Sequence, residues 1–169
     1  KGFDHVTLND ICRASDVATG TFYHYFNSTQ AVLLEILVME GEEIQKYYEG
    51  LKKENPLKQL RLLLAYQIEY FEKKGKEVVA RIYSMELNNR QGTARLLKAL
   101  PIMNLVEKVL LEAQEAGELK PDLNINYCTM TLLSLILGYS FFWLSSEEQG
   151  TLKDISFNHI MAEVQRMSI

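Results

Sequence analysis

The sequence has few of the residues that build covalent or metal-based frameworks. Its 169 residues include two cysteines and three histidines. Cys12 and Cys128 lie far apart and outside any spacing typical of metal ligands, so we expect a reducing cytoplasm rather than a disulfide framework. The histidines at 5, 24 and 159 belong to different segments, and no glycine-rich phosphate loop or paired-carboxylate motif is present. These absences exclude the common signatures of metal sites and enzymes, and we expect no cofactor.

Proline is equally scarce, with three residues, whereas apolar residues make up 47% of the chain. This composition excludes a disordered chain and permits long helices. The length suffices for one substantial core, or for a small module joined to a larger one. The chain opens at Lys1 without a methionine, so we expect it to begin partway into a domain.

The chain has fewer basic than acidic residues. Lysine and arginine number 18 against 22 aspartates and glutamates, which gives a formal net charge of −4. That balance excludes a protein that coats nucleic acid indiscriminately, but it permits a sequence-specific reader of DNA, which needs only a local footprint. Even residues 1–30 carry more acidic than basic side chains, with Lys1 and Arg13 against Asp4, Asp10 and Asp16.

Apolar residues recur at helical spacing along almost the whole chain, without a strand pattern or an internal repeat. The predicted fold is therefore all-α, with a small N-terminal unit (1–30) and a larger helical body (31–169). Pro56 suits the first turn of a helix, Gly75 and Gly117 suit helix ends, and Pro101 is expected to end or kink a helix. The predicted helices span residues 8–14, 19–26, 29–50, 56–74, 76–88, a pattern from 93 that meets Pro101 and resumes towards 117, then 127–144 and 154–167. Along 29–50 the expected apolar stripe is Val32, Ile36, Met39, Ile44, Tyr47 and Leu51.

One stretch is markedly hydrophobic: YCTMTLLSLILGYSFFWL, residues 127–144. It falls short of a comfortable membrane span and contains Thr, Ser and Gly throughout. We therefore expect a helix that is buried on most of its sides, and no membrane partner.

Residues 8–26 read as two short helices joined by a turn at Ser15-Asp16-Val17, with Val17 inserted between the helices. This is the helix-turn-helix layout, in which the second helix enters the major groove of DNA. That helix starts with the small residues Ala18, Thr19, Gly20 and Thr21, which permit a close approach to bases and phosphates. Backbone N–H groups at a helix N-terminus also attract anions without help from lysine or arginine.

The aromatic run FYHYF, residues 22–26, divides by helical phase. Phe22 and Phe26 are four apart and share a face, which we expect to pack inward. Tyr23 is then directed to the groove, and His24 and Tyr25 flank it towards the sugar-phosphate backbone. The alternative for each ring is a place in the core.

The segment TLNDICRASDVATGTFYHYFNSTQAVL, residues 7–33, resembles the DNA-binding segment of the TetR family of one-component transcriptional regulators. The resemblance covers roughly residues 3 to 37, and beyond it the chain is similar in helix layout. The segment AGELKPDLN, residues 116–124, is similar to a break that precedes the family's dimerisation helices. The shared marks are Thr7, Ile11, Val17, Gly20-Thr21-Phe22-Tyr23, Tyr25-Phe26 and Ser28.

The resemblance implies DNA-contacting roles by position. Base-facing roles fall to Asn9, Ala18, Thr19, Gly20 and Tyr23, and phosphate-facing roles to Thr7, Thr21, His24, Tyr25 and Thr29. Asn9 is alternatively a plain surface residue. Family members commonly have Lys at the position of Thr29 and often at that of Thr19, and the family's first helix, often basic, precedes Lys1. The two missing lysines should weaken the affinity for DNA and flatten its salt dependence.

The resemblance also implies an effector pocket in the body. Rings and thioethers can line an adaptable cavity, although at helical spacing they are alternatively core. Arg81, Glu69 and Glu86 lie on otherwise apolar segments and either pair with an effector or form exposed salt bridges. The candidate effector residues are Tyr66, Tyr70, Phe71, Arg81, Tyr83, Met85, Met103, Tyr127 and Phe142.

Small residues in the hydrophobic helix favour a contact between two copies of the chain. Ser134 and Gly138 are four apart and would let another helix approach closely, and the last helix offers an apolar face. We predict a four-helix contact between two protomers, although both stripes could instead bury within one chain. The candidate dimer residues are Ser134, Gly138, Phe141, Phe157, Met161 and Val164.

The resulting hypothesis is a ligand-responsive repressor that binds double-stranded operator DNA as a homodimer. The two reading helices would lie one helical turn, roughly 34–36 Å, apart. A small apolar or amphipathic effector would shift the long helix that starts at Thr29, and a coupling of about 1–3 kcal/mol would release the DNA. The alternatives are a helical ligand-binding or interaction protein with weak or lost DNA binding, and a small all-α enzyme.

Overall fold

The computed structural model describes residues 8–26, 29–88, 101–146 and 150–169, which are helical almost throughout. Among these residues there is no strand, and the one isolated β-bridge joins Leu119 to Ser168. The all-α prediction is confirmed. The helices are α1 (Leu8–Ala14), α2 (Thr19–Tyr25), α3 (Thr29–Leu51), α4 (Pro56–Lys74), α5 (Lys76–Asn88), α7 (Pro101–Glu115), α8 (Ile125–Ser145) and α9 (Leu152–Met167).

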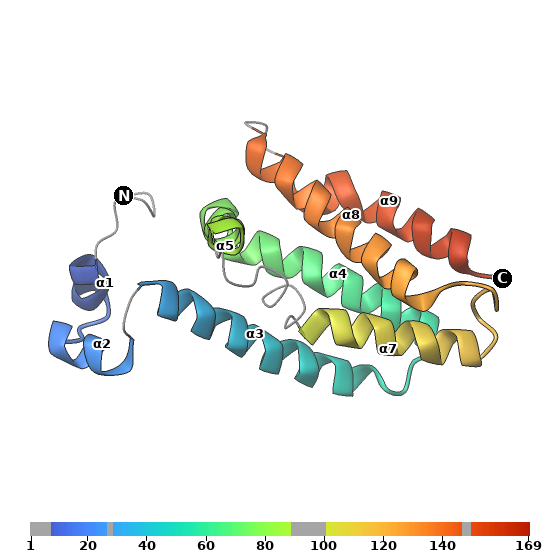
Figure 1. The fold of residues 1–169 in the computed structure, drawn as a ribbon, viewed down its shortest axis with the longest axis horizontal. Coiled ribbons are helices and arrows are strands. Elements are labelled where there is room, and N and C mark those ends of the chain that lie inside the picture. Colours follow the sequence, from blue (N-terminus) through green and yellow to red (C-terminus); the bar gives the residue numbers. More distant parts are fainter. Residues whose placement is uncertain (1–7, 27–28, 89–100, 147–149) are drawn as a thin grey trace.

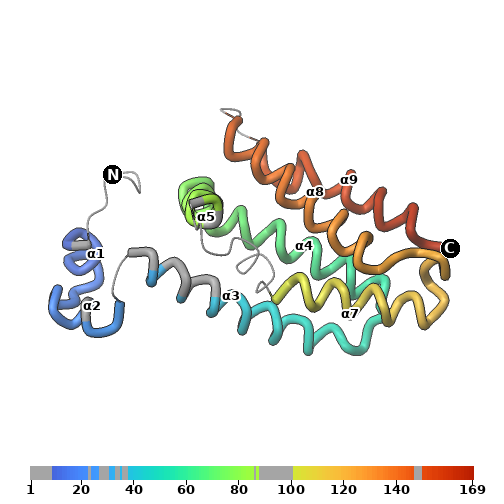
Figure 2. Tube along the Cα trace, viewed as in Figure 1, coloured from blue at the N-terminus to red at the C-terminus, as the bar shows by residue number. Residues whose placement is uncertain are grey.

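The helices form two units of unequal size (Figure 1). The head consists of α1 and α2. The body consists of α4, α5, α7, α8 and α9, with α4 packed between α7 and α9 and α8 packed against α7 and α9. The long helix α3 starts beside the head and continues along α4 and α7, so one continuous helix joins the units (Figure 2).

Local signals in the sequence define where the body helices begin. The side chain of Asn55 accepts a hydrogen bond from the backbone N–H of Lys58 at 2.8 Å, and Pro56 takes the first helical position of α4, where no N–H is needed. Asn124 caps α8 in the same way. Thr151 and Asp154 form a reciprocal capping box, so α9 begins at Leu152, two residues before the predicted start.

Two glycines define where helices end. Gly75 follows α4 with φ of 83°, and Gly117 follows α7 with φ of 74°. Both angles lie in the region that glycine adopts without a steric penalty. Pro101 begins α7, and the helical pattern predicted from residue 93 to it lies outside the described residues.

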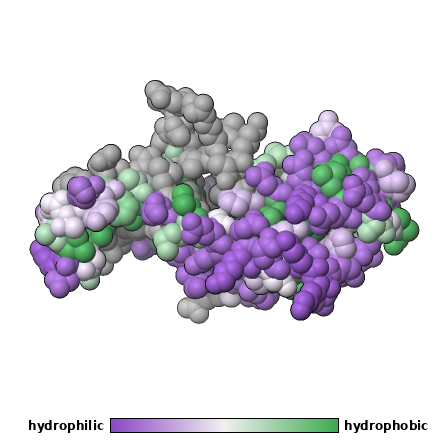
Figure 3. All heavy atoms as spheres, turned by 90° about the horizontal axis from the view of Figure 1, so that it is seen from below, coloured by the Kyte–Doolittle hydropathy of each residue, from purple (hydrophilic) through white to green (hydrophobic). Residues whose placement is uncertain are grey.

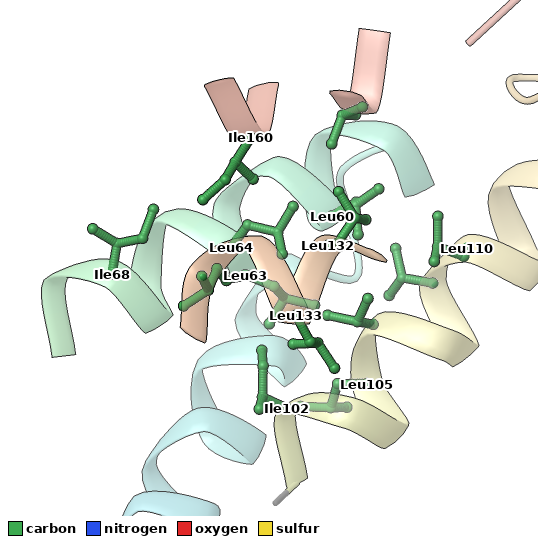
Figure 4. Packing of buried hydrophobic residues seen from close by; sticks show 14 of the residues in the cluster. Leu60, Leu63, Leu64, Ile68, Ile102, Leu105, Leu110, Leu132, Leu133 and Ile160 are labelled. Atoms are coloured by element: carbon green, nitrogen blue, oxygen red, sulfur yellow. The ribbon is translucent and has the colours of Figure 1, made fainter. Parts of the chain in front are cut away.

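The core of the body is built around α4. Leu60, Leu63, Leu64 and Ile68 are fully buried on one side of this helix. They meet side chains from α7, α8 and α9 in one continuous apolar cluster (Figure 4), which includes Leu105, Leu110, Leu132, Leu133 and Ile160. Truncating one such leucine to alanine typically costs about 2–5 kcal/mol, so this cluster holds the body together.

The C-terminal half of α3 is anchored in this core by Ile44, Tyr48 and Leu51. Met39, predicted to lie on the same apolar stripe, is instead 54% exposed. The reason is helical phase, because Glu40 and Gly41 form the buried face of this turn and Met39 lies beside that face.

The hydrophobic helix α8 has one buried and one exposed apolar face. Cys128, Leu132, Ile136 and Trp143 are buried, whereas Tyr127 is 72% exposed and Phe142, Phe141 and Met130 are also exposed. Burial on most sides was therefore the wrong expectation for a single chain. Length and composition alone would let α8 cross a membrane, but its buried face packs against α7 and α9 as a core helix does. The face of the body that Figure 3 shows from below is largely hydrophilic.

Candidate DNA-binding and effector sites

The head has the predicted helix-turn-helix geometry. After α1 the backbone N–H of Ser15 donates to the carbonyl of Ile11 and that of Val17 to the carbonyl of Cys12, each at 2.9 Å. Asp16 adopts a left-handed conformation with φ of 55°, which reverses the chain direction before α2. Val17 is 36% exposed in the described structure, so it is not inserted between the helices as predicted.

Among the described side chains of the head, two are buried in its small interior. Cys12 of α1 and Phe22 of α2 are both buried. The ring of Phe22 packs against that of Phe26 with centroids 5.3 Å apart, and Phe26 is half-buried. The inward orientation predicted for Phe22 is confirmed, and that of Phe26 is confirmed in part.

The predicted DNA-contacting residues that the structure describes all lie on the surface of the head. Thr19 and Asn9 connect the start of α2 to the first turn of α1, because the Thr19 hydroxyl donates to the Asn9 Oδ1 at 3.5 Å. The rings of His24 and Tyr25 meet edge to face with centroids 5.2 Å apart. A Cβ added at Gly20 would meet no atom within 4 Å, so the backbone there is open to an approaching ligand. The exposed residues are Asn9, Ala18, Thr19, Gly20, Thr21, His24 and Tyr25.

Three predicted DNA contacts lie outside the described residues in whole or in part. Thr7 precedes the first described residue. Tyr23 lies in α2 and Thr29 begins α3, but their side chains are not among those described. The predicted direction of Tyr23 into the groove stays a prediction.

The candidate effector residues divide into two groups. Tyr70, Phe71 and Met85 are buried, and Tyr66, Arg81, Tyr83 and Met103 are half-buried. Tyr127 and Phe142, in contrast, lie on the exposed face of α8, so the structure does not bring them together with the others. Helical phase explains the correction, because positions 127 and 142 share the face of α8 that points away from the core.

Tyr83 connects α5 to α8. Its hydroxyl donates to the carbonyl of Leu137 at 2.9 Å and also pairs with the hydroxyl of the buried Ser140. Burial raises the pKa of Tyr83, so the phenol stays protonated. Glu69 forms a surface ion pair with Lys153 at 2.7 Å, so of the two roles considered for it the structure shows the exposed salt bridge. The side chain of Glu86 lies outside the described residues.

A polar cluster between α3 and α4 was not predicted from the sequence as a unit. Glu40, Gln67 and Tyr70 are 4%, 3% and 5% exposed, and the Gln67 Nε2 donates to the Glu40 Oε1 at 3.2 Å. Burial raises the pKa of the Glu40 carboxyl. Burial, followed by the nearby Glu40 charge, raises the pKa of the Tyr70 phenol. The sequence feature that could have indicated this cluster is the placement of Glu40 and Gln67 on otherwise apolar helix faces.

The candidate dimer residues are divided between surface and core. Ser134, Gly138 and Phe141 are exposed on α8, and a Cβ added at Gly138 would meet no atom of its own chain within 4 Å. Phe157 and Met161 of α9 are half-buried against the core. Val164, predicted for the interface, is instead fully buried in its own chain, because it lies on the side of α9 that packs against the core.

Over the described ranges, no three side chains of His, Cys, Asp or Glu gather in a way that would hold a metal ion. Cys12 and Cys128 are free and buried in different units.

Residues 1–36 match the family described as bacterial regulatory proteins, tetR family. This match relates the N-terminal segment of the chain to the tetR-family regulators. It is 27% identical over 142 residues to the transcriptional regulator UidR of Escherichia coli strain K12, covering 81% of this chain and 70% of that protein. It is 22% identical over 161 residues to the fatty acid metabolism regulator protein of Bacillus subtilis strain 168, covering 92% and 81% of the two chains.

Solved TetR-type structures share the fold of this chain. The FadR repressor of Thermus thermophilus, solved with lauroyl-CoA, superposes with a TM-score of 0.75 at 23% identity, over 100% of this chain and 88% of that one. The ketosteroid regulator KstR2 of Mycobacterium tuberculosis superposes with a TM-score of 0.64 at 17% identity, over 98% and 86%. This chain therefore shares their fold, from the helix-turn-helix head to the helical body.

Proposed function

We propose that this protein is a TetR-type transcriptional repressor that binds operator DNA as a homodimer and is released by a small effector. The observation that carries the proposal is the head itself: a helix-turn-helix with an exposed second helix, joined by α3 to a separate helical body. Acting on DNA, the protein belongs in the cytoplasm. Its relatives are regulators, and we propose that it too acts by binding rather than by catalysis.

In the DNA complex, α2 lies in the major groove. Small and polar residues at its start, Thr19, Gly20 and Thr21, approach the bases closely, and Tyr23 reads a base edge or a thymine methyl group. His24 and Tyr25 follow on the exposed surface and contact the backbone of the duplex. Because the head has few cations, hydrogen bonds from hydroxyl and amide groups replace much of the usual lysine and arginine contact.

The homodimer forms through the exposed apolar face of α8. Tyr127, Met130, Phe141 and Phe142 are exposed apolar side chains on one helix of the described structure, which a soluble monomer rarely leaves in contact with water. Ser134 and Gly138 between them permit a close helix-helix approach. A two-fold axis brings the same face from both protomers together, and Phe157 and Met161 extend the contact from α9.

The effector is an apolar or amphipathic molecule that enters the body. The buried rings of Tyr70 and Phe71, with Tyr66 beside them, supply apolar and aromatic surface. Two similar proteins support a molecule with a long alkyl chain: the Thermus thermophilus repressor solved with lauroyl-CoA and the Bacillus subtilis fatty acid metabolism regulator.

Selection from random duplex DNA by the full-length protein, followed by gel shifts at low salt, tests this function. We expect a two-fold symmetric site and weaker binding when lauroyl-CoA is added. Failure to select any sequence would overturn the repressor assignment. It would favour the second candidate, a ligand-binding TetR-like protein without DNA binding, which the acidic balance of residues 1–30 motivates.

A further inference from the structure

Three polar side chains lie together in the otherwise apolar contact between α3 and α4. Gln67 and Tyr70 are three residues apart on α4 and share a face, and Glu40 of α3 meets them from across the contact. All three are at least 95% buried. Polar side chains at this depth are normally fully hydrogen-bonded.

Here two atoms lack a partner. The Gln67 amide donates to Glu40, but the Gln67 Oε1 accepts no hydrogen bond, and the Tyr70 hydroxyl makes none of acceptable geometry. The Tyr70 hydroxyl lies beside the Glu40 carboxyl, whose charge acts on its pKa. The buried Gln67 Oε1 thus has no donor, and the buried Tyr70 hydroxyl has the Glu40 carboxyl beside it without a hydrogen bond of full geometry.

The two unpartnered atoms define the chemistry of that molecule. Gln67 Oε1 requires a donor, whereas the Tyr70 hydroxyl donates to an acceptor. A hydroxyl group supplies both at once. A free carboxylate only accepts, so it leaves Gln67 unsatisfied and places a second negative group beside Glu40.

We propose that Glu40, Gln67 and Tyr70 form the polar subsite of the effector site, which selects a neutral hydroxyl group on an otherwise apolar molecule. This proposal rests on the effector-responsive function proposed above. The stacked rings of Tyr47 and Tyr66, with centroids 4.6 Å apart, lie next to the cluster on the same two helices and provide the adjoining apolar surface.

The position of the subsite connects binding to the head. Glu40 belongs to α3, the helix that runs to the DNA-binding unit, and its hydrogen bond to Gln67 is a direct link between α3 and α4. A hydroxyl bound beside this link competes for the same polar atoms. Ligand binding at the subsite therefore changes the packing of α3 against the body.

Two probes with the same twelve-carbon chain test the selection: dodecan-1-ol and dodecanoate, titrated into the full-length protein by calorimetry below their aggregation concentrations. We expect the alcohol to bind at least about tenfold more tightly than the acid. Tyr70→Phe and Gln67→Leu should each weaken the alcohol about fivefold, the effect of one hydrogen bond, and leave the acid nearly unchanged.

Gln59→Leu is the matched control, because Gln59 is an equally buried glutamine two turns earlier on α4 with its own unpartnered Oε1. It should leave the ratio of the two affinities unchanged. Tyr70→Phe removes one oxygen only, and circular dichroism verifies that each variant is folded.

Equal or tighter binding of the acid overturns the proposal, as does an alcohol that does not bind. Alcohol affinity that is unaffected by Tyr70→Phe and Gln67→Leu also overturns it, since the two atoms then serve only the core or a bound water. Selection of DNA in the absence of any ligand tests the repressor function separately from the subsite. Loss of DNA binding counts against the repressor function, whereas a preference for the acid counts against the subsite alone.

Discussion

Gly41 of α3 lies directly against Pro101, the first residue of α7. A Cβ added at Gly41 would stand 2.7 Å from the Cγ of the proline ring, closer than real carbon atoms approach. The absence of a side chain at Gly41 therefore sets the distance between α3 and the start of α7. This contact lies one residue from Glu40, on the helix that runs to the head.

Gly41→Ala should destabilise the protein. Overpacking costs about 1–3 kcal/mol, and the gain in helix propensity of about 1 kcal/mol offsets only part of it. Gly50→Ala is the control in the same helix, because an added Cβ there meets no atom within 4 Å. Urea unfolding measures the free energy of unfolding of both variants. If the two substitutions change it equally, the contact between Gly41 and Pro101 does not limit the packing.

Gly138→Leu should weaken the homodimer and leave the fold of the chain intact. Space around Gly138 is open within its own chain, so a leucine is accommodated there until a second protomer approaches. We expect at least a tenfold rise in the dimer dissociation constant, about 1.4 kcal/mol, in analytical ultracentrifugation.

Val164→Ala gives the opposite pattern. Val164 is fully buried within one chain, so its truncation should cost roughly 2 kcal/mol of folding stability and leave the dimer constant unchanged. For the first variant, a dimer dissociation constant that Gly138→Leu leaves unchanged would mean that the interface lies elsewhere.

Glu40→Gln should stabilise the protein in a pH-dependent way. Burial raises the pKa of Glu40, while Gln67, Tyr70 and Lys74 act in the opposite direction and Glu43 adds to the rise. The folded state thus binds the proton more tightly than the unfolded chain. The stability that protonated Glu40 contributes is fully present below its ordinary pKa of 4.5 and is lost as the pH rises through the folded-state pKa.

Glutamine cannot ionise but still accepts a hydrogen bond from Gln67. The free energy of unfolding of Glu40→Gln should therefore exceed that of the wild type at pH 7, and the difference should shrink as the pH falls towards 4.5. Glu42→Gln, at an exposed position two residues later in α3, is the control. A difference that does not vary with pH contradicts the buried-acid account.

Tyr23→Ala should reduce operator affinity by at least about 1 kcal/mol, the scale of one specific contact, while fold and dimer persist. Fluorescence anisotropy with the selected operator measures the loss. Phe22→Ala is the contrasting variant: Phe22 is buried, so its truncation should lower the stability of the head as well. Unchanged DNA affinity in Tyr23→Ala means that α2 does not read the groove through this residue.

Thr29→Lys should increase DNA affinity and steepen its dependence on salt. A lysine at the start of α3 restores a phosphate contact that TetR-family members commonly have, which adds about one to the slope of log affinity against log salt. Binding titrations from low to moderate salt give this slope. Thr29→Gln, which adds length without charge, should leave the slope at the wild-type value.

Helix boundaries in this protein follow closely from local sequence. Asn55-Pro56 and Gly75 bound α4 at the predicted residues, because capping hydrogen bonds and the φ angles of proline and glycine act within one turn. The helix-turn-helix was predictable for the same reason: its turn and its inward-facing Phe22 depend on neighbours a few residues away.

Tertiary structure decided which faces and atoms meet. The exposed face of α8 depends on where α7 and α9 lie, which helical periodicity does not specify for a helix that is apolar all round. The burial of Val164 depends on where α4 and α8 lie against α9. Glu40 and Gln67 are 27 residues apart, and Gly41 and Pro101 are further apart still. Sequence by itself determined the helices and the helix-turn-helix of the head, because those depend on short-range hydrogen bonds and steric limits. Only packing between distant helices determined the polar cluster of Glu40, Gln67 and Tyr70 and the contact of Gly41 with Pro101.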